Sequence, residues 1–122
     1  STLMAVLGQR LVRRVCKNCR TPFEPTEAQL AMLNLSPHDL GDKVFYYGRG
    51  CSTCNDTGYK GRKGIYELLI ISDAIRNLIN ERAPTVVMRQ KAIELGMVTL
   101  REDGLRSIFE GTTSIEEVVK YT

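Results

Sequence analysis

The sequence contains four cysteines, and they form two C-x-x-C pairs, Cys16 with Cys19 and Cys51 with Cys54. A tetrahedral thiolate site needs four soft ligands around one ion, and two tight turns that each present two sulfurs are the usual way to supply them. Asn18 lies inside the first pair and glycines flank the second, which suits tight turns. The pattern predicts a closed structural metal site with zinc as the ion.

The two pairs are far apart in the sequence. Residues 20–50 separate them, and this insertion is longer than the roughly 15–20 residues of common zinc ribbons. We therefore expect the insertion to hold structure of its own. Thr26 and Gln29 form a capping-box pattern that predicts a short helix, and the aromatic run 43–47 predicts a strand. The only histidine, His38, lies beside a proline and outside any ligand spacing, so we expect it at the surface.

Four cysteines can also form disulfides, a redox motif or an iron site. A small secreted domain could pair them as disulfides in three ways. The chain opens with Ser1-Thr2-Leu3-Met4, without the basic region and cleavage site of a signal peptide, which argues against that alternative. A thioredoxin-like redox motif would use one C-x-x-C pair at a helix start, not two matched pairs. A rubredoxin-type iron site uses the same ligands, so the sequence leaves iron open beside zinc.

The composition is ordinary for a soluble globular protein, with 122 residues of which 43% are hydrophobic and 25% charged. The charge is unevenly distributed. Residues 1–63 carry ten Lys or Arg against five Asp or Glu, whereas residues 64–122 carry seven against nine. The basic half is also the cysteine half, so part of its positive charge can offset four metal-bound thiolates.

The regions around the cysteines predict the rest of the fold. Residues 3–15 place Leu3, Leu7, Leu11 and Val15 at helical spacing, which predicts a helix already under way and hence a piece of a longer chain. Residues 64–71 predict a buried strand. Helices should follow it, with N-caps at Ser72, Thr85, Thr99 and Ser114.

These elements predict an α+β fold in three parts. Residues 1–15 would be a helix from the end of a preceding core. Residues 16–63 would form a small tetracysteine zinc subdomain with short antiparallel strands. Residues 64–122 would form a strand followed by a small helical bundle.

No catalytic constellation stands out in the sequence. Gly58, Gly61 and Gly64 alternate with basic residues as in a phosphate-binding loop, but no lysine follows a glycine, so there is no Walker A motif. The acidic pairs 102–103 and 116–117 fall in first turns of predicted helices, where the helix dipole explains them. Four thiolates also close a zinc shell and leave no position for a reactive water. We predict no catalytic residue, and a scaffold or interaction module.

Four motifs occur in order along the chain. They are Gln9-Arg10-Leu11-Val12-Arg13 before the first cysteine pair, the segment 50–62 followed by Gly64-Ile65-Tyr66-Glu67-Leu68-Leu69, Thr99-Leu100-x-x-Asp103-Gly104-Leu105, and Gly111-Thr112-Thr113-Ser114-Ile115-Glu116-Glu117-Val118. Together they resemble the C-terminal end of the bacterial type II secretion and type IV pilus assembly ATPases, the GspE/PilB family. The resemblance covers nearly the whole chain.

The resemblance implies a parent protein with an activity that this chain lacks. The parent would be a cytoplasmic, homohexameric P-loop ATPase that uses ATP and magnesium to power type IV pilus assembly or type II protein secretion. Its partners would be the rest of the ATPase core, neighbouring subunits and an inner-membrane platform protein, with no nucleic acid. Cys16, Cys19, Cys51 and Cys54 match the family's zinc subdomain. Without Walker A and Walker B motifs, the chain alone should not hydrolyse ATP.

Two further classes are alternatives. A nucleic-acid-binding zinc ribbon would explain the basic bias of residues 10–20 and 58–63 and should bind with strong salt dependence. Such a protein would normally interleave exposed aromatic residues with the basic ones, and only Tyr59 does so here. Residues 51–58 also resemble the C-x-x-C-x-G-x-G repeat of DnaJ co-chaperones. Asp56 stands where that repeat has glycine, and the repeat occurs only once.

Overall fold

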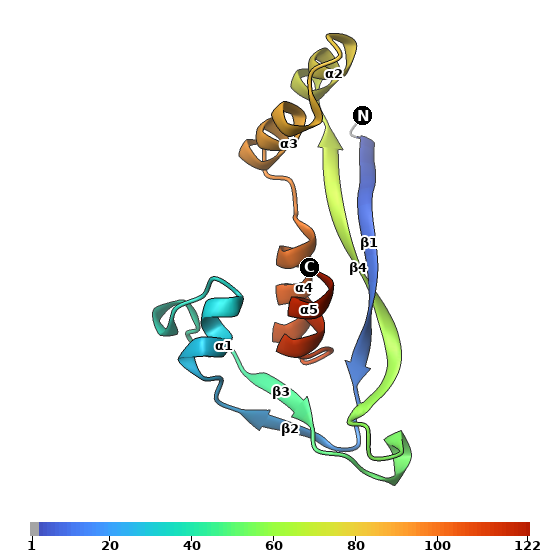
Figure 1. The fold of residues 1–122 in the computed structure, drawn as a ribbon, viewed down its shortest axis with the longest axis vertical. Coiled ribbons are helices and arrows are strands. Elements are labelled where there is room, and N and C mark those ends of the chain that lie inside the picture. Colours follow the sequence, from blue (N-terminus) through green and yellow to red (C-terminus); the bar gives the residue numbers. More distant parts are fainter. Residues whose placement is uncertain (1–2) are drawn as a thin grey trace.

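Two antiparallel ribbons form the framework of the molecule in the computed structural model, which describes residues 3–122. β1 (Leu3–Val15) pairs with β4 (Tyr59–Ile71) in the long ribbon. β2 (Arg20–Phe23) pairs with β3 (Phe45–Gly48) in the short ribbon. The two ribbons diverge from the end of the long ribbon at which β1 stops and β4 starts (Figure 1).

Helices fill the angle between the ribbons and cover the other end of the long one (Figure 1). The connection from β2 to β3 holds α1 (Glu27–Met32) and a short 3-10 turn, η1 (Pro37–Asp39), and a second such turn, η2 (Ser52–Cys54), precedes β4. The chain then continues through α2 (Asp73–Asn80), α3 (Thr85–Glu94), α4 (Leu100–Phe109) and α5 (Ile115–Tyr121). Within residues 3–122, no helix is long and apolar enough to cross a bilayer.

The helix predicted for residues 3–15 is wrong, because this segment is strand β1. Its register with β4 shifts between Val6 and Gly8, which leaves Leu7 in a bulge. A bulge interrupts the period-two alternation by which a strand is recognised in a sequence. Leu7 and Leu11 are 52% and 50% exposed, so these members of the apparent helical stripe do not face a core.

The predicted strands at 43–47 and 64–71 are confirmed as β3 and β4. β4 begins earlier than expected, at Tyr59, and therefore continues through the predicted boundary between residues 63 and 64. It is also less buried than expected. Ile65 is fully buried, but Ile70 on the opposite face is exposed, because helices cover only one face of the long ribbon.

Local signals placed most of the helix starts correctly. Thr26, Ser72, Thr99 and Ser114 all act as N-caps whose side chains accept a backbone N–H. Thr85 was wrongly predicted as a cap, because Pro84 occupies the N-cap position and Thr85 is the first helical residue. The predicted single helical bundle is also wrong, because α2 and α3 pack in one apolar cluster while α4 and α5 belong to another.

The larger apolar cluster joins the insertion to the last two helices. We call residues 20–50 the arm, and we call the cluster the arm core; its buried members are Leu30, Leu33, Phe45, Ile108, Ile115 and Val118. Phe45 of β3 packs edge-on against Phe109 of α4, with ring centroids 5.5 Å apart. Arg20 donates a hydrogen bond to the carbonyl of Gly111 at 3.1 Å. The arm is therefore packed on α4 and α5 and does not project freely.

Candidate metal centre

Each C-x-x-C pair lies in one of the two connections through which the chain passes from one ribbon to the other, and we call these two connections the crossings. Cys16 follows the end of β1 and Cys19 precedes β2, while Cys51 follows β3 and Cys54 precedes β4. Antiparallel pairing holds β1 beside β4 and β2 beside β3, so the two crossings must lie next to each other. We call residues 16–19 and 51–58 the knuckle. The long spacing between the pairs is explained, because the whole arm is inserted between its two crossings.

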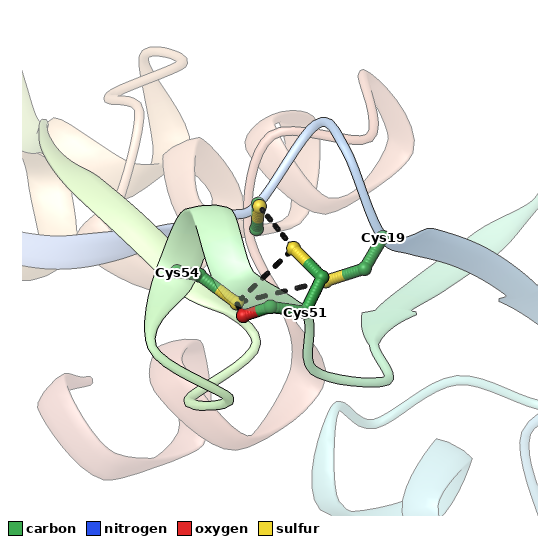
Figure 2. Close-up of side chains that lie close together, drawn as sticks. Cys19, Cys51 and Cys54 are labelled. Carbon is green, nitrogen blue, oxygen red and sulfur yellow. Dashed lines mark hydrogen bonds between the residues drawn. The ribbon is translucent and has the colours of Figure 1, made fainter.

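The four cysteine sulfurs converge at this junction (Figure 2). All four Sγ atoms lie within 4.8 Å of one another. The Cys16–Cys51 and Cys19–Cys54 Sγ separations are 3.8 Å, and the Cys51–Cys54 separation is 3.7 Å. A tetrahedron with zinc–sulfur bonds of about 2.3 Å has sulfur–sulfur edges of about 3.8 Å. The four side chains therefore fit around a single metal ion.

Burial and close backbone packing fix the positions of these sulfurs. Cys16, Cys19 and Cys54 are buried and Cys51 is partly exposed. The backbone N–H of Gly58 donates to the Cys54 sulfur at 3.2 Å. A Cβ atom on Gly48 would lie 2.0 Å from the Gly58 carbonyl oxygen, and Gly58 has a φ of +81°. The end of β3 and the backbone just before β4 approach so closely that only glycine fits at both positions.

The polar surroundings shift the pKa values of the thiols in different directions. A hydrogen bond from the Asn18 side chain lowers the pKa of Cys51 to about 6. Burial raises the pKa of Cys19 to about 11. For Cys54, burial acts to raise the pKa, but the Gly58 N–H and other donors outweigh it and the pKa is lowered. Metals bind the thiolate form, so loading this site would release protons from the buried thiols.

The predicted ligand set is brought together, and the histidine lies elsewhere. The cluster able to hold a metal contains the four cysteines and no other residue type within the described part of the chain. His38 is exposed in η1, in the arm, as expected from the sequence. Four thiolates suit zinc or iron and would leave no open coordination position.

Two acidic residues have structural roles that the sequence did not indicate. Glu117 and Asp103 were assigned to the helix dipole, but both side chains are buried. Glu117 accepts hydrogen bonds from the Arg13 backbone N–H at 3.2 Å and from the Arg13 guanidinium. Asp103 accepts from the backbone N–H of Tyr66 at 2.8 Å. Each acid fixes the first turn of a helix to a strand of the long ribbon, and no local pattern marks such a contact.

Arg13, which contacts Glu117 of α5, also contacts the first residue of β4. The Arg13 guanidinium lies 4.0 Å from the centroid of the Tyr59 ring. The Tyr59 hydroxyl is 2.7 Å from the Ser114 hydroxyl, which is also the N-cap of α5. Both strands of the long ribbon, β1 and β4, are thus fixed to α5 near the knuckle by a continuous polar network.

Comparison with known proteins gives one consistent result. Residues 1–120 match the family described as Type II/IV secretion system protein. The chain is 43% identical over its whole length to the Type IV pilus assembly ATPase PilB of Thermus thermophilus, of which it covers 14%. It is 38% identical over its whole length to the Type II secretion system protein E of Pseudomonas aeruginosa and 40% identical to PilB of Myxococcus xanthus, covering 24% and 22% of them. The chain thus spans at most about a quarter of these relatives.

Proposed function

The chain belongs to the type II/IV secretion system protein family, and on this premise we propose that it is the zinc-stabilised C-terminal portion of an ATPase that powers type IV pilus assembly or type II protein secretion. The parent would be a cytoplasmic P-loop hexamer that binds ATP and magnesium through parts outside this chain and docks on an inner-membrane platform protein. Residues 1–15 would continue its core. The chain itself would act as a structural and interaction module.

The observation that carries this proposal is the convergence of four sulfurs at the junction of the two ribbons. Cys16, Cys19, Cys51 and Cys54 would hold the zinc ion. Bound zinc supplies a closed tetrahedral cross-link there and no reactive water. The apolar side chains packed at this point are the cysteines themselves, so the knuckle has little hydrophobic core of its own.

A cross-link at this place would fix the angle between the ribbons. Besides the sulfurs, backbone hydrogen bonds join the two crossings, from Cys16 N–H to the Gly58 carbonyl at 2.9 Å and from Arg49 N–H to the Cys19 carbonyl at 3.4 Å. The second of these is long and weak. With the knuckle rigid and the arm packed on α4 and α5, a displacement of the long ribbon would carry the arm with it. This is how we propose that movement of the ATPase core reaches a partner.

Metal analysis is the first test of this function. We expect about one zinc per chain, and all four thiols recovered in denaturant after chelation. Iron in place of zinc would contradict the assignment of the ion. Thiols that are already oxidised, with no metal present, would contradict the site itself.

A second test uses the full-length parent protein in its own cell. We expect Cys54→Ser to abolish pilus or pseudopilus assembly while the purified protein still binds nucleotide. The matched control is Ser52→Ala, which changes an exposed side chain in the same turn. Normal assembly in the cysteine variant would overturn the proposed role of the knuckle.

A further inference from the structure

The basic side chains without a partner are gathered at one end of the molecule. Most Lys and Arg side chains within residues 3–122 form an ion pair, a hydrogen bond or a cation–π contact. Those that form none are Arg14, Lys17, Arg49, Lys60, Arg62 and Arg82. All of these except Arg82 lie in the knuckle or within a few residues of it.

Three of these cations line a recess beside the metal centre. Arg14, Lys17 and Lys60 surround a pocket of about 380 Å³, together with the polar side chains of Asn18 and Thr53. Val15 and Cys16, one of the four candidate metal ligands, complete the lining. No acidic residue lines it. The pocket therefore combines concentrated positive charge with hydrogen-bonding groups.

The long ribbon shapes this recess. Arg14 is the partly buried member of the three cations, and a Cβ atom on Gly61 would lie 3.3 Å from its Cδ. Gly61 also has a φ of +85°, a conformation that favours glycine. The glycine at this position thus leaves room for the Arg14 stem, which explains one member of the glycine-rich segment that resembled a phosphate-binding loop.

The negative charge of a filled metal centre would not neutralise all of these unpartnered cations. Zinc bound by four thiolates carries a formal charge of about −2. Asp56 is the exposed acid of the knuckle and adds one more negative charge. The five unpartnered cations exceed these three negative charges, so this end of the molecule keeps a net positive charge after the site is filled.

The surroundings favour a protein partner over a lipid surface. Peripheral membrane binding normally adds inserted apolar side chains to a basic cluster. No large apolar side chain of the knuckle is strongly exposed; the exposed ones lie on β1, the arm, the far part of β4 and the segment from α2 to Val98. A recess with amide and hydroxyl groups beside its cations fits a protruding carboxylate better than a flat layer of headgroups.

We propose that the pocket formed by Arg14, Lys17 and Lys60 binds an acidic, Asp- or Glu-rich segment of the partner protein on which the parent docks. This inference rests on the proposed docking role and specifies the chemistry of the partner. Contacts of this kind steer association and set specificity through charge. Binding should therefore weaken steeply as the salt concentration rises.

The test measures binding of the zinc-loaded chain to a fluorescent decaglutamate peptide by anisotropy. Lys60→Glu and Lys17→Glu reverse one charge on either side of the pocket. Arg82→Glu is the matched control, because Arg82 is also exposed and unpartnered but follows α2. We expect each pocket variant to weaken binding about tenfold, equivalent to about 1.4 kcal/mol, and the control to weaken it less than about twofold.

Three outcomes would overturn the inference. One is no binding of the peptide by the zinc-loaded chain, and another is an equal loss in the pocket variants and the control. The third is tighter binding of phosphatidylglycerol-containing vesicles, or of a thymidine decanucleotide, than of the peptide, with the same dependence on Lys60. Such a result would assign the surface to a membrane or to nucleic acid. Zinc content measured on the same samples separates the two proposals, because a zinc-loaded chain that binds no peptide overturns only this one.

Discussion

The knuckle and the arm core are neighbours, but different forces hold them together. In the knuckle, the buried groups are cysteine sulfurs and close-packed glycines. The arm core buries Leu30, Phe45, Ile108 and other apolar side chains from the arm, α4 and α5. In the proposed function, a bound ion would hold the thiolates of the first region together, whereas the second region is stabilised by burial of its apolar side chains. Their stabilities should therefore be separable.

The largest expected effect is the loss of metal from Cys54→Ser. Structural zinc sites have apparent binding free energies of about 10–16 kcal/mol, and removing one of four ligands forfeits much of this. We expect elemental analysis to find little zinc, and amide exchange at Asp56 and Thr57 to become fast. Amides of α4 should stay protected.

Ser52→Ala serves as the control for this variant and should retain zinc. If the amides of α4 lost their protection together with those of the knuckle, the arm core would depend on the metal. The separation of the two regions would then be wrong.

The converse experiment is Phe45→Ala in the arm core. Phe45 is fully buried, and removing such a ring costs about 3–5 kcal/mol through lost burial and the cavity left behind. We expect a lower free energy of unfolding in urea with zinc still bound. Tyr47→Ala on the same strand is the control, because Tyr47 is 45% exposed and should cost much less. Release of zinc from the Phe45 variant would show that both regions unfold as one unit.

A smaller effect is expected where the two regions are joined. Glu117→Gln removes the charge that accepts from the Arg13 backbone and guanidinium. Hydrogen bonds to charged groups contribute about 1.5–3 kcal/mol. We therefore expect the substitution to lower the free energy of unfolding by an amount in this range. Glu116→Gln, at the exposed neighbouring position, should change it by less than about 0.5 kcal/mol. Equal effects of the two variants would contradict the conclusion that Glu117 stabilises the fold through its contacts with Arg13.

The smallest effect is a dependence of stability on pH near the start of α4. Hydrogen bonding from Arg89 lowers the pKa of Glu67, which also accepts from the Leu100 N–H. A lowered pKa stabilises the fold above the unfolded Glu value of about 4.3, and this stabilisation is lost as pH falls through the folded value. Because Arg89 is about half exposed, we expect about 0.5–1 kcal/mol.

Urea unfolding at pH 7 and at pH 3 measures this dependence. Glu67→Gln should reduce the loss of stability on acidification, and Glu94→Gln, in an exposed ion pair with Lys91, should leave it nearly unchanged. An unchanged acid response in the Glu67 variant would contradict the assignment. The comparison is best made without metal, because acid also protonates the thiols of the knuckle.

Local chemistry explains which parts of the fold could be predicted. Thr26, Ser72, Thr99 and Ser114 cap helices because a side-chain oxygen reaches an N–H two or three residues ahead, and that interaction is contained in the sequence. The short strand β3 was also predictable from its aromatic residues. Thr85 failed as a cap because the helix begins one residue earlier than its side chain suggested, with Pro84 at the N-cap position and no side-chain cap hydrogen bond.

The strand at residues 3–15 could not be predicted from its own residues. Its leucines and arginines are good helix formers, and the bulge at Leu7 hides the alternation of a strand. Its pairing partners lie 44 to 68 residues away, on the other side of the arm. Non-local pairing decided its conformation, and with it the division of the helices into two separate pairs.

By itself, the sequence determined the four candidate ligands, because two C-x-x-C turns present their sulfurs locally whatever surrounds them. It also determined where most helices begin. Only the tertiary structure decided that the turns are crossings between two ribbons, that Glu117 and Asp103 are buried, and that unpartnered cations gather around one pocket. These features depend on strands and helices from distant parts of the chain meeting in space, and no local pattern encodes such meetings.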